Sequence, residues 1–126
     1  MEQWEIEGTD YTPRVKLDAA KSILSIEGRS YPEEGLDFYE PIMSRSLSLA
    51  KSDKPLTKLE VRLEYYNSIT IKAISELIGH LKQVEEDGHD IKILWEYEED
   101  DDGIADDVDM FRHTFNIDIE ERYTTF

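Results

Sequence analysis

Leu56 to Lys72 read LTKLEVRLEYYNSITIK, and the spacing of the apolar residues changes within this segment. In its first half apolar and polar residues alternate, as in a strand with one buried face. The side chains expected on that face are Leu59, Val61, Leu63 and Tyr65. Apolar residues then recur every three or four positions from Ile71 to Val84, which predicts an amphipathic helix directly after the strand.

The corner between this strand and this helix is Asn67-Ser68-Ile69-Thr70. A helix N-terminus has free backbone N–H groups and the positive end of the helix dipole, so it stabilises an anion. Ser and Thr are also preferred N-cap residues, each stabilising a helix by about 1 kcal/mol. A hydroxyl at this corner is therefore either a helix cap or a place for a phosphate, and the pattern alone leaves both interpretations open.

The rest of the chain alternates predicted strands and helices. We expect strands at 14–17 and 22–27, joined by a hairpin turn at 18–21, and further strands at 90–97 and 117–123. A helix is predicted after residue 35, with Pro41 bending it or marking its first turn, and another at 104–115. The apolar side of the earlier helix is expected to carry Leu36, Tyr39, Ile42, Met43, Leu47 and Ala50.

This order of elements predicts a single-domain α/β fold over residues 1–126, with a mixed β-sheet and about three helices. Functional loops in such sheets lie at the carboxyl ends of the strands, which includes the corner at Asn67–Thr70. A chain of 126 residues is long enough for one hydrophobic core and too short for two.

The formal net charge is −16, which argues against nucleic-acid or anionic-membrane binding, because a phosphate backbone would be repelled. The chain has no cysteine, so disulfides, thiol catalysis and Cys-ligated zinc are excluded. The N-terminus from Met1 to Glu7 is acidic and lacks the apolar run of a signal peptide, and no segment reaches transmembrane length. The simplest expectation is a soluble, cytoplasmic protein.

Catalytic and cofactor sites are hard to assemble from this sequence. His80, His89 and His113 lack metal-ligand spacing, and each is expected at the surface or at a helix end. The glycines are isolated, so no phosphate-binding loop is present, and none of the many carboxylate pairs stands out as an acid and base. We therefore expect neither an enzyme nor a cofactor.

The acidic run from Glu98 to Asp109 offers one alternative. Its oxygen ligands and turn glycine have an EF-hand-like spacing, which suits a hard cation. The positions concerned are Glu98, Asp100, Asp102, Gly103, Asp106 and Asp109. Both end residues depart from the pattern, and the segment before the run is a predicted strand, whereas an EF-hand has a helix there. Acids at the start of the following helix are explained more simply by its dipole, so a solvated acidic loop is favoured over a metal site.

Several segments, taken in order, resemble the SiaC family of bacterial regulatory phosphoproteins, which is related in fold to the STAS domains of anti-anti-sigma factors. They are Gly8–Pro13, Ser30–Glu33, Phe38–Pro41, Leu63–Lys72 and Trp95–Tyr97. The resemblance covers nearly the whole chain. The family corner usually reads Asn-Thr-Ser-Ser, so Ser68 matches the phosphoacceptor position, Ile69 departs from the pattern, and Thr70 is the second candidate.

The resemblance implies a STAS-like, non-enzymatic partner-switching protein. A histidine-kinase-like ATPase would phosphorylate it, a PP2C-type phosphatase would reverse this, and the unphosphorylated form would bind an effector such as a diguanylate cyclase. Tyr66, Asn67, Ile69 and Lys72 flank Ser68, so a partner that senses Ser68 must touch some of them. Ile69 is either an exposed contact residue or a core residue that caps the sheet. The runner-up function is an acidic binding module that is independent of phosphorylation, followed by a cation-binding domain.

Overall fold

The computed structural model describes residues 3–33 and 36–126 and forms one six-stranded sheet with three helices. In chain order the elements are β1 (Gln3–Ile6), β2 (Arg14–Asp18), β3 (Ile23–Ser30), α1 (Glu40–Ala50), β4 (Lys58–Tyr66), α2 (Ser68–Glu86), β5 (Lys92–Tyr97), α3 (Asp102–Phe115) and β6 (Glu120–Tyr123). This arrangement confirms the predicted α/β fold with a mixed sheet and three helices.

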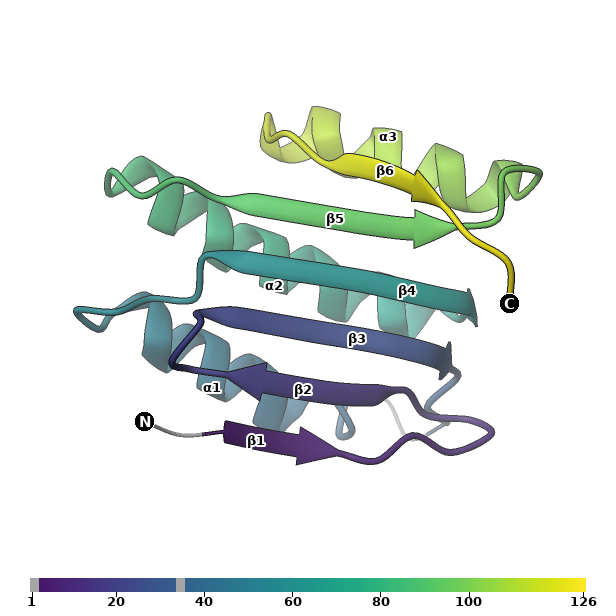
Figure 1. Ribbon diagram of the computed structural model, residues 1–126, viewed down its shortest axis with the longest axis horizontal. Helices are drawn as coiled ribbons and strands as arrows, with labels where there is room; N and C mark the ends of the chain where they lie inside the picture. The colour runs from purple at the N-terminus through teal and green to yellow at the C-terminus, as the bar shows by residue number, and fades with distance from the viewer. Residues whose placement is uncertain (1–2, 34–35) are drawn as a thin grey trace.

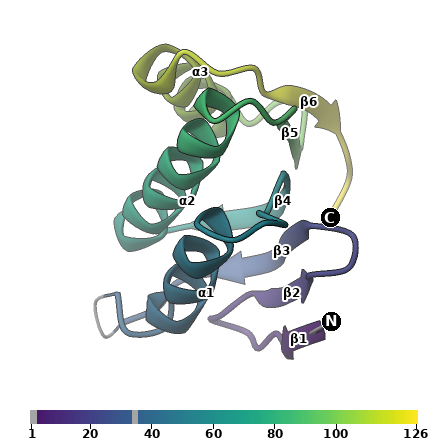
Figure 2. The same ribbon diagram turned by 90° about the vertical axis from the view of Figure 1, so that its left-hand side faces the viewer.

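The strands lie in the sheet in the same order as in the chain. β1, β2 and β3 pair antiparallel, whereas β3 to β6 pair parallel through the helical crossovers. All three helices cover one face of the sheet and leave the other face open (Figures 1 and 2). The carboxyl ends of the four parallel strands therefore meet along one edge.

The core lies between the sheet and its helices. Leu59, Val61 and Leu63 of β4 face the helices and are almost fully buried, as predicted. They pack with the apolar side of α2, where Ile74, Leu77, Ile78, Leu81 and Val84 are also buried. Within the described residues, no helix combines the length and the apolar character needed to cross a membrane.

The prediction that Tyr65 lies on the buried face of β4 was wrong, because its side chain is 41% exposed. Gly28 of β3 pairs with Leu63, but the next residue, Arg29, pairs with Tyr65, so Glu64 is an extra residue in β4. Such a β-bulge reverses the alternation of the strand. It turns Tyr65 outward, and Tyr66 packs against the core instead.

Other predicted boundaries shift in smaller ways. The strand β1 was missed, because it has only four residues with half-buried Trp4 and Ile6 as its apolar positions. The last strand is shorter than predicted, although Ile117 and Ile119 before it are buried. Leu47 was expected on the apolar side of α1 but is 43% exposed. Pro41 lies in the first turn of α1, as one of the two predictions for it had stated.

Candidate functional site

The candidate site lies where β3 and β4 end side by side. Ser30, the last residue of β3, pairs with Tyr66, the last residue of β4. Asn67 follows at once, and its backbone N–H donates to the Ser30 carbonyl oxygen at 3.1 Å. α2 begins at Ser68, so this corner joins the end of a central strand to a helix N-terminus.

Asn67 is the N-cap of α2. Its backbone is extended, and its Oδ1 accepts a hydrogen bond from the Thr70 backbone N–H at 3.1 Å. Its Nδ2 donates to the carbonyl oxygen of Pro32 at 3.0 Å, which holds the loop after β3. Asn67 is therefore the residue that caps α2. The sequence pattern had left open whether a hydroxyl residue of the corner has this role.

Thr70 is fully buried within a group of three hydroxyls. Its Oγ1 lies 2.6 Å from Ser30 Oγ, and Ser30 Oγ lies 2.6 Å from Tyr39 Oη. Thr70 Oγ1 also lies 3.1 Å from the Ser30 carbonyl oxygen and 3.0 Å from Asn67 Oδ1. All three residues have no exposed surface, and burial raises the pKa of the Tyr39 hydroxyl to about 12.

Ser68 differs from Thr70 in its surroundings. It is the first residue of α2, its side chain is exposed, and within the described part of the chain its hydroxyl has no hydrogen-bond partner. Lys72, four positions further along α2, is also exposed, whereas Ile69 is half-buried. The first turn of α2 carries no acidic residue.

Tyr66 connects the corner to α3. Its hydroxyl donates to Asp107 Oδ2 at 2.6 Å, and its ring lies 6.2 Å from that of Trp95. Burial, followed by the hydrogen bond to Asp107 and its charge, raises the pKa of Tyr66 well above its usual range. A hollow of about 350 Å³ lies between Tyr65, Tyr66 and the start of α3.

Tyr65 points to the other side of the corner. Its ring lies 6.1 Å from that of Tyr31, edge to face, and the Arg29 guanidinium lies 5.6 Å from its centroid. Tyr31 and Tyr65 are both exposed. The bulge in β4 therefore places one tyrosine in a bond to α3 and its neighbour in an exposed aromatic contact.

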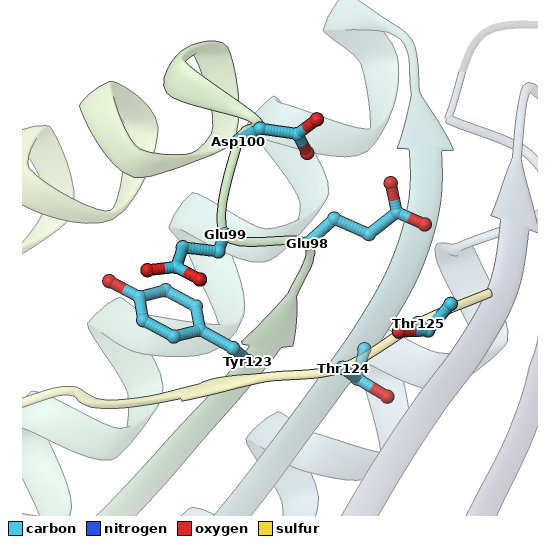
Figure 3. Close-up of a pocket in the computed structure, with 6 residues that line it drawn as sticks. All are labelled: Glu98, Glu99, Asp100, Tyr123, Thr124 and Thr125. Carbon is cyan, nitrogen blue, oxygen red and sulfur yellow. The ribbon is translucent and has the colours of Figure 1, made fainter.

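The acidic run does not have the geometry of an EF-hand loop. α3 begins at Asp102, so Asp102, Asp106 and Asp109 are helical residues, and Asp101 caps the helix through a bond to the Ile104 N–H at 3.0 Å. Among the residues that the structure describes, no three carboxylates or histidines come together as metal ligands. The loop instead forms one wall of an open hollow of about 600 Å³. Figure 3 shows the residues that line this hollow, Glu98, Glu99, Asp100, Tyr123, Thr124 and Thr125.

Sequence reasoning identified the corner but missed three residues that contribute to it. Ser30 and Tyr39 supply hydroxyls from β3 and from the residue before α1, and Asp107 accepts from Tyr66. Each lies far from the corner in sequence. Ser30 gave no signal, because the predicted strand ended at residue 27 whereas β3 continues to Ser30, and a buried polar side chain is informative only once its place on a strand is known.

Proteins of known structure share this fold. SiaC of Pseudomonas aeruginosa superimposes with a TM-score of 0.85 at 26% identity, over 98% of this chain and 100% of that one. A chain in the crystal structure of the diguanylate cyclase SiaD in complex with its activator SiaC, from the same organism, gives 0.85 at 26% identity, over 96% and 99%. An uncharacterized protein of Pseudomonas aeruginosa strain UCBPP-PA14 is 29% identical over 89% of each chain.

These similarities place the chain among regulatory proteins rather than enzymes. The family model for SiaC family regulatory phosphoproteins matches residues 6–122, so the chain belongs to the SiaC family. The match includes the whole corner from Tyr66 to Lys72 and the buried hydroxyls beneath it.

Proposed function

We propose that this chain is the switch component of a partner-switching pathway, in which reversible phosphorylation of Ser68 controls binding to an effector. The observation that carries the proposal is the exposed Ser68 hydroxyl at the first position of α2. A kinase must reach the hydroxyl oxygen in line with the transferred phosphoryl group. Ser68 allows this approach without any movement of the fold.

Thr70 is the second candidate, and its surroundings favour Ser68 over it. The Thr70 hydroxyl has no exposed surface and lies within hydrogen-bond distance of Ser30 and Asn67. Phosphorylating it would require opening the first turn of α2. A phosphate on Ser68 would instead lie beside the free N–H groups and the positive dipole end of α2, which tolerate negative charge.

Similarity to the SiaC family supports the partners that we propose. SiaC of Pseudomonas aeruginosa is the activator of the diguanylate cyclase SiaD. By this similarity the unphosphorylated chain binds and activates an effector of the diguanylate cyclase type. A histidine-kinase-like ATPase phosphorylates Ser68 and a PP2C-type phosphatase removes the phosphate. Because the kinase needs ATP, the switch operates in the cytoplasm.

The sign of the switch has a physical reason. Phosphorylation adds about −1.5 to −2 charges at the corner. An effector surface that fits the neutral hydroxyl and the adjacent Lys72 and Ile69 would then face an unpaired, strongly hydrated anion. Asn67 and Tyr66 lie at the same corner but are half-buried, so they hold its shape as well as contributing to contact.

The test is to incubate the chain with its kinase and ATP and to locate the phosphate by mass spectrometry. We expect a single phosphate on Ser68, its loss in the Ser68→Ala variant and its retention in Thr70→Ser. Phosphate found only on Thr70 would overturn the assignment to Ser68, and phosphate found only outside Asn67–Thr70 would overturn the corner as the switch.

The acidic hollow favours a second function, in which the chain binds a basic partner independently of phosphorylation. Glu98, Glu99 and Asp100 line this hollow, and Figure 3 shows the Glu99 side chain beside the Tyr123 ring. Neutralising the three acids to Gln, Gln and Asn distinguishes the two functions. Under the switch proposal these changes leave effector binding intact, whereas the acidic-module function requires that binding be lost and that every change at Ser68 be harmless.

A further inference from the structure

The three buried hydroxyls beneath the corner come from three separate segments. Ser30 ends β3, Tyr39 immediately precedes α1, and Thr70 lies in the first turn of α2. Their oxygens form a continuous chain with two contacts of 2.6 Å. Each hydroxyl has only one proton to donate, so the acceptors at the two ends determine which way the chain runs.

At the Thr70 end two oxygens can only accept from it, the Ser30 carbonyl and Asn67 Oδ1. Asn67 Oδ1 is fixed as the oxygen because its Nδ2 donates to Pro32. At the other end, Tyr39 Oη has two hydroxyl partners, Ser30 and Thr70, and no carbonyl or carboxylate acceptor among the described residues. Its buried proton therefore goes to one of these two hydroxyls.

The proton direction is therefore fixed at Thr70. The protons of Tyr39 and Ser30 have only the other hydroxyls of the series as acceptors, whereas Thr70 Oγ1 directs its one proton toward the Ser30 carbonyl and Asn67 Oδ1 at the corner. Hydrogen bonds in such a series polarise one another in a surrounding of low dielectric constant. The series ends on the side-chain oxygen of Asn67, the residue directly before Ser68.

We propose that Tyr39 and Ser30 are positioning residues of the phosphorylation corner, which act on Ser68 through Thr70 and the Asn67 cap. We call the series of hydroxyls of Tyr39, Ser30 and Thr70 the relay. The role of Ser68 rests on the proposed function, but the existence of the relay does not. Tyr39 is also the N-cap position of α1, and its carbonyl oxygen accepts from the Met43 N–H at 2.9 Å. The relay thus ties the first turn of α1 to the first turn of α2, so a partner that shifts α1 alters the presentation of Ser68.

The first test needs no kinase. Tyr39→Phe keeps the ring in the core and removes only its hydroxyl from the relay. We expect hydrogen–deuterium exchange of the Thr70 backbone amide to accelerate at least fivefold, and the Asn67 side-chain amide resonances to shift. Tyr97→Phe is the matched control, because it removes another core tyrosine hydroxyl, one that bonds to Glu121 on β6. Thr70→Val removes the hydroxyl at the other end of the relay and should accelerate exchange of the backbone amide of residue 70 in the same way. Thr70→Ser keeps a hydroxyl there, and its amide should exchange as slowly as in the wild type. Unchanged Thr70 exchange in Tyr39→Phe would overturn the relay.

The second test measures the rate of Ser68 phosphorylation by the kinase that modifies the wild-type chain. We expect kcat/KM to fall about tenfold for Tyr39→Phe and to stay within twofold for Tyr97→Phe. An unchanged rate, together with altered Thr70 exchange, would overturn the positioning role while leaving the relay intact. If the wild type itself carries no phosphate on Ser68, the proposed function fails, and the exchange measurement still decides the relay.

Discussion

Ser68 and Thr70 lie two positions apart at the start of α2, yet the Ser68 side chain is exposed and that of Thr70 is fully buried. The helix geometry causes this difference, because residues two positions apart point to different sides of the helix. The Asn67 cap fixes the rotation of the first turn by bonding to the Thr70 N–H. The two hydroxyls of the corner therefore have different roles. That of Ser68 is accessible from solvent, whereas that of Thr70 takes part in the hydrogen bonds that hold the first turn of α2.

The cap assignment predicts unequal effects of two alanine substitutions. Asn67→Ala removes the N-cap bond and the bond to Pro32, and should lower the free energy of unfolding by about 1 to 2 kcal/mol. Ser68→Ala removes an exposed hydroxyl that caps nothing and should change it by less than about 0.5 kcal/mol. Urea denaturation of both variants measures the difference. Equal losses would contradict the assignment of Asn67 as the cap.

The bulge in β4 predicts a similar contrast between neighbouring tyrosines. Tyr66→Phe removes a hydrogen bond to the Asp107 carboxylate and should cost about 1 to 2 kcal/mol of stability. Tyr65→Phe is the matched control, since the Tyr65 hydroxyl has no partner within the described residues, and should be nearly neutral. Combining Tyr66→Phe with Asp107→Asn should give less than the sum of the two single losses. Strict additivity would show that the bond contributes nothing.

The sequence predicted the elements from β4 to β5 well, because their apolar spacing is regular over long segments. It could not predict the orientation of Tyr65, since the bulge depends on the register between β4 and β3 at Gly28, whose φ of 110° few other residues adopt. β1 was missed because a four-residue strand is recognisable mainly by its pairing with β2. Local patterns determine each element, whereas pairing between distant segments determines these details.

The candidate site divides in the same way. The corner at Asn67–Thr70 was predictable, because the alternation of apolar residues typical of a strand ends there and the three-to-four-residue spacing typical of a helix begins. The hydroxyl series beneath it was not, since Ser30 and Tyr39 reach Thr70 only once β3, α1 and α2 have assembled. Tyr39 had been predicted for its apolar ring alone. A buried polar atom becomes informative only when its partner is known.

His80 predicts a pH dependence of stability. It was expected at the surface or at a helix end, but it lies within α2, half-buried, with Nδ1 3.1 Å from Ser46 Oγ on α1. Burial is the largest effect and lowers the pKa of His80. The charge of Glu76 opposes this lowering, and the charge of Lys51 adds to it. The folded state therefore binds fewer protons than the unfolded state near the ordinary pKa, and the stability this gives is present above that value and lost as the pH falls below it.

The measurement is the free energy of unfolding between about pH 7.5 and 5.5, a range that spans the ordinary histidine pKa of about 6.5. Wild-type stability should fall with decreasing pH, and the fall should be smaller in His80→Gln. His89→Gln, at an exposed position between α2 and β5, is the control and should keep the wild-type slope. An unchanged slope in His80→Gln would contradict the prediction.

The exposed Lys72 predicts where the effector binds. Lys72→Glu reverses a charge four positions from Ser68 and should weaken effector binding at least tenfold while leaving the melting temperature nearly unchanged. Lys21→Glu makes the same change in net charge in the turn before β3, at the opposite edge of the sheet, and should bind as the wild type does. If the two variants lose affinity equally, overall charge and not the corner governs binding.

The last prediction concerns the sign of the switch at Ser68. Ser68→Asp and Ser68→Glu should fold as stably as the wild type or slightly better, since an acid in the first turn interacts favourably with the helix dipole. Both should nevertheless bind the effector more weakly, because the new charge faces a contact that fits a hydroxyl. Ser68→Ala should bind as the unphosphorylated chain does and resist the kinase. Thermal melts and titration calorimetry on the variants compare stability with affinity directly. If Ser68 has only a structural role, its substitutions change stability and leave the affinity for the effector unchanged. Acidic variants that bind the effector as tightly as the wild type would therefore remove the support for Ser68 as the switch.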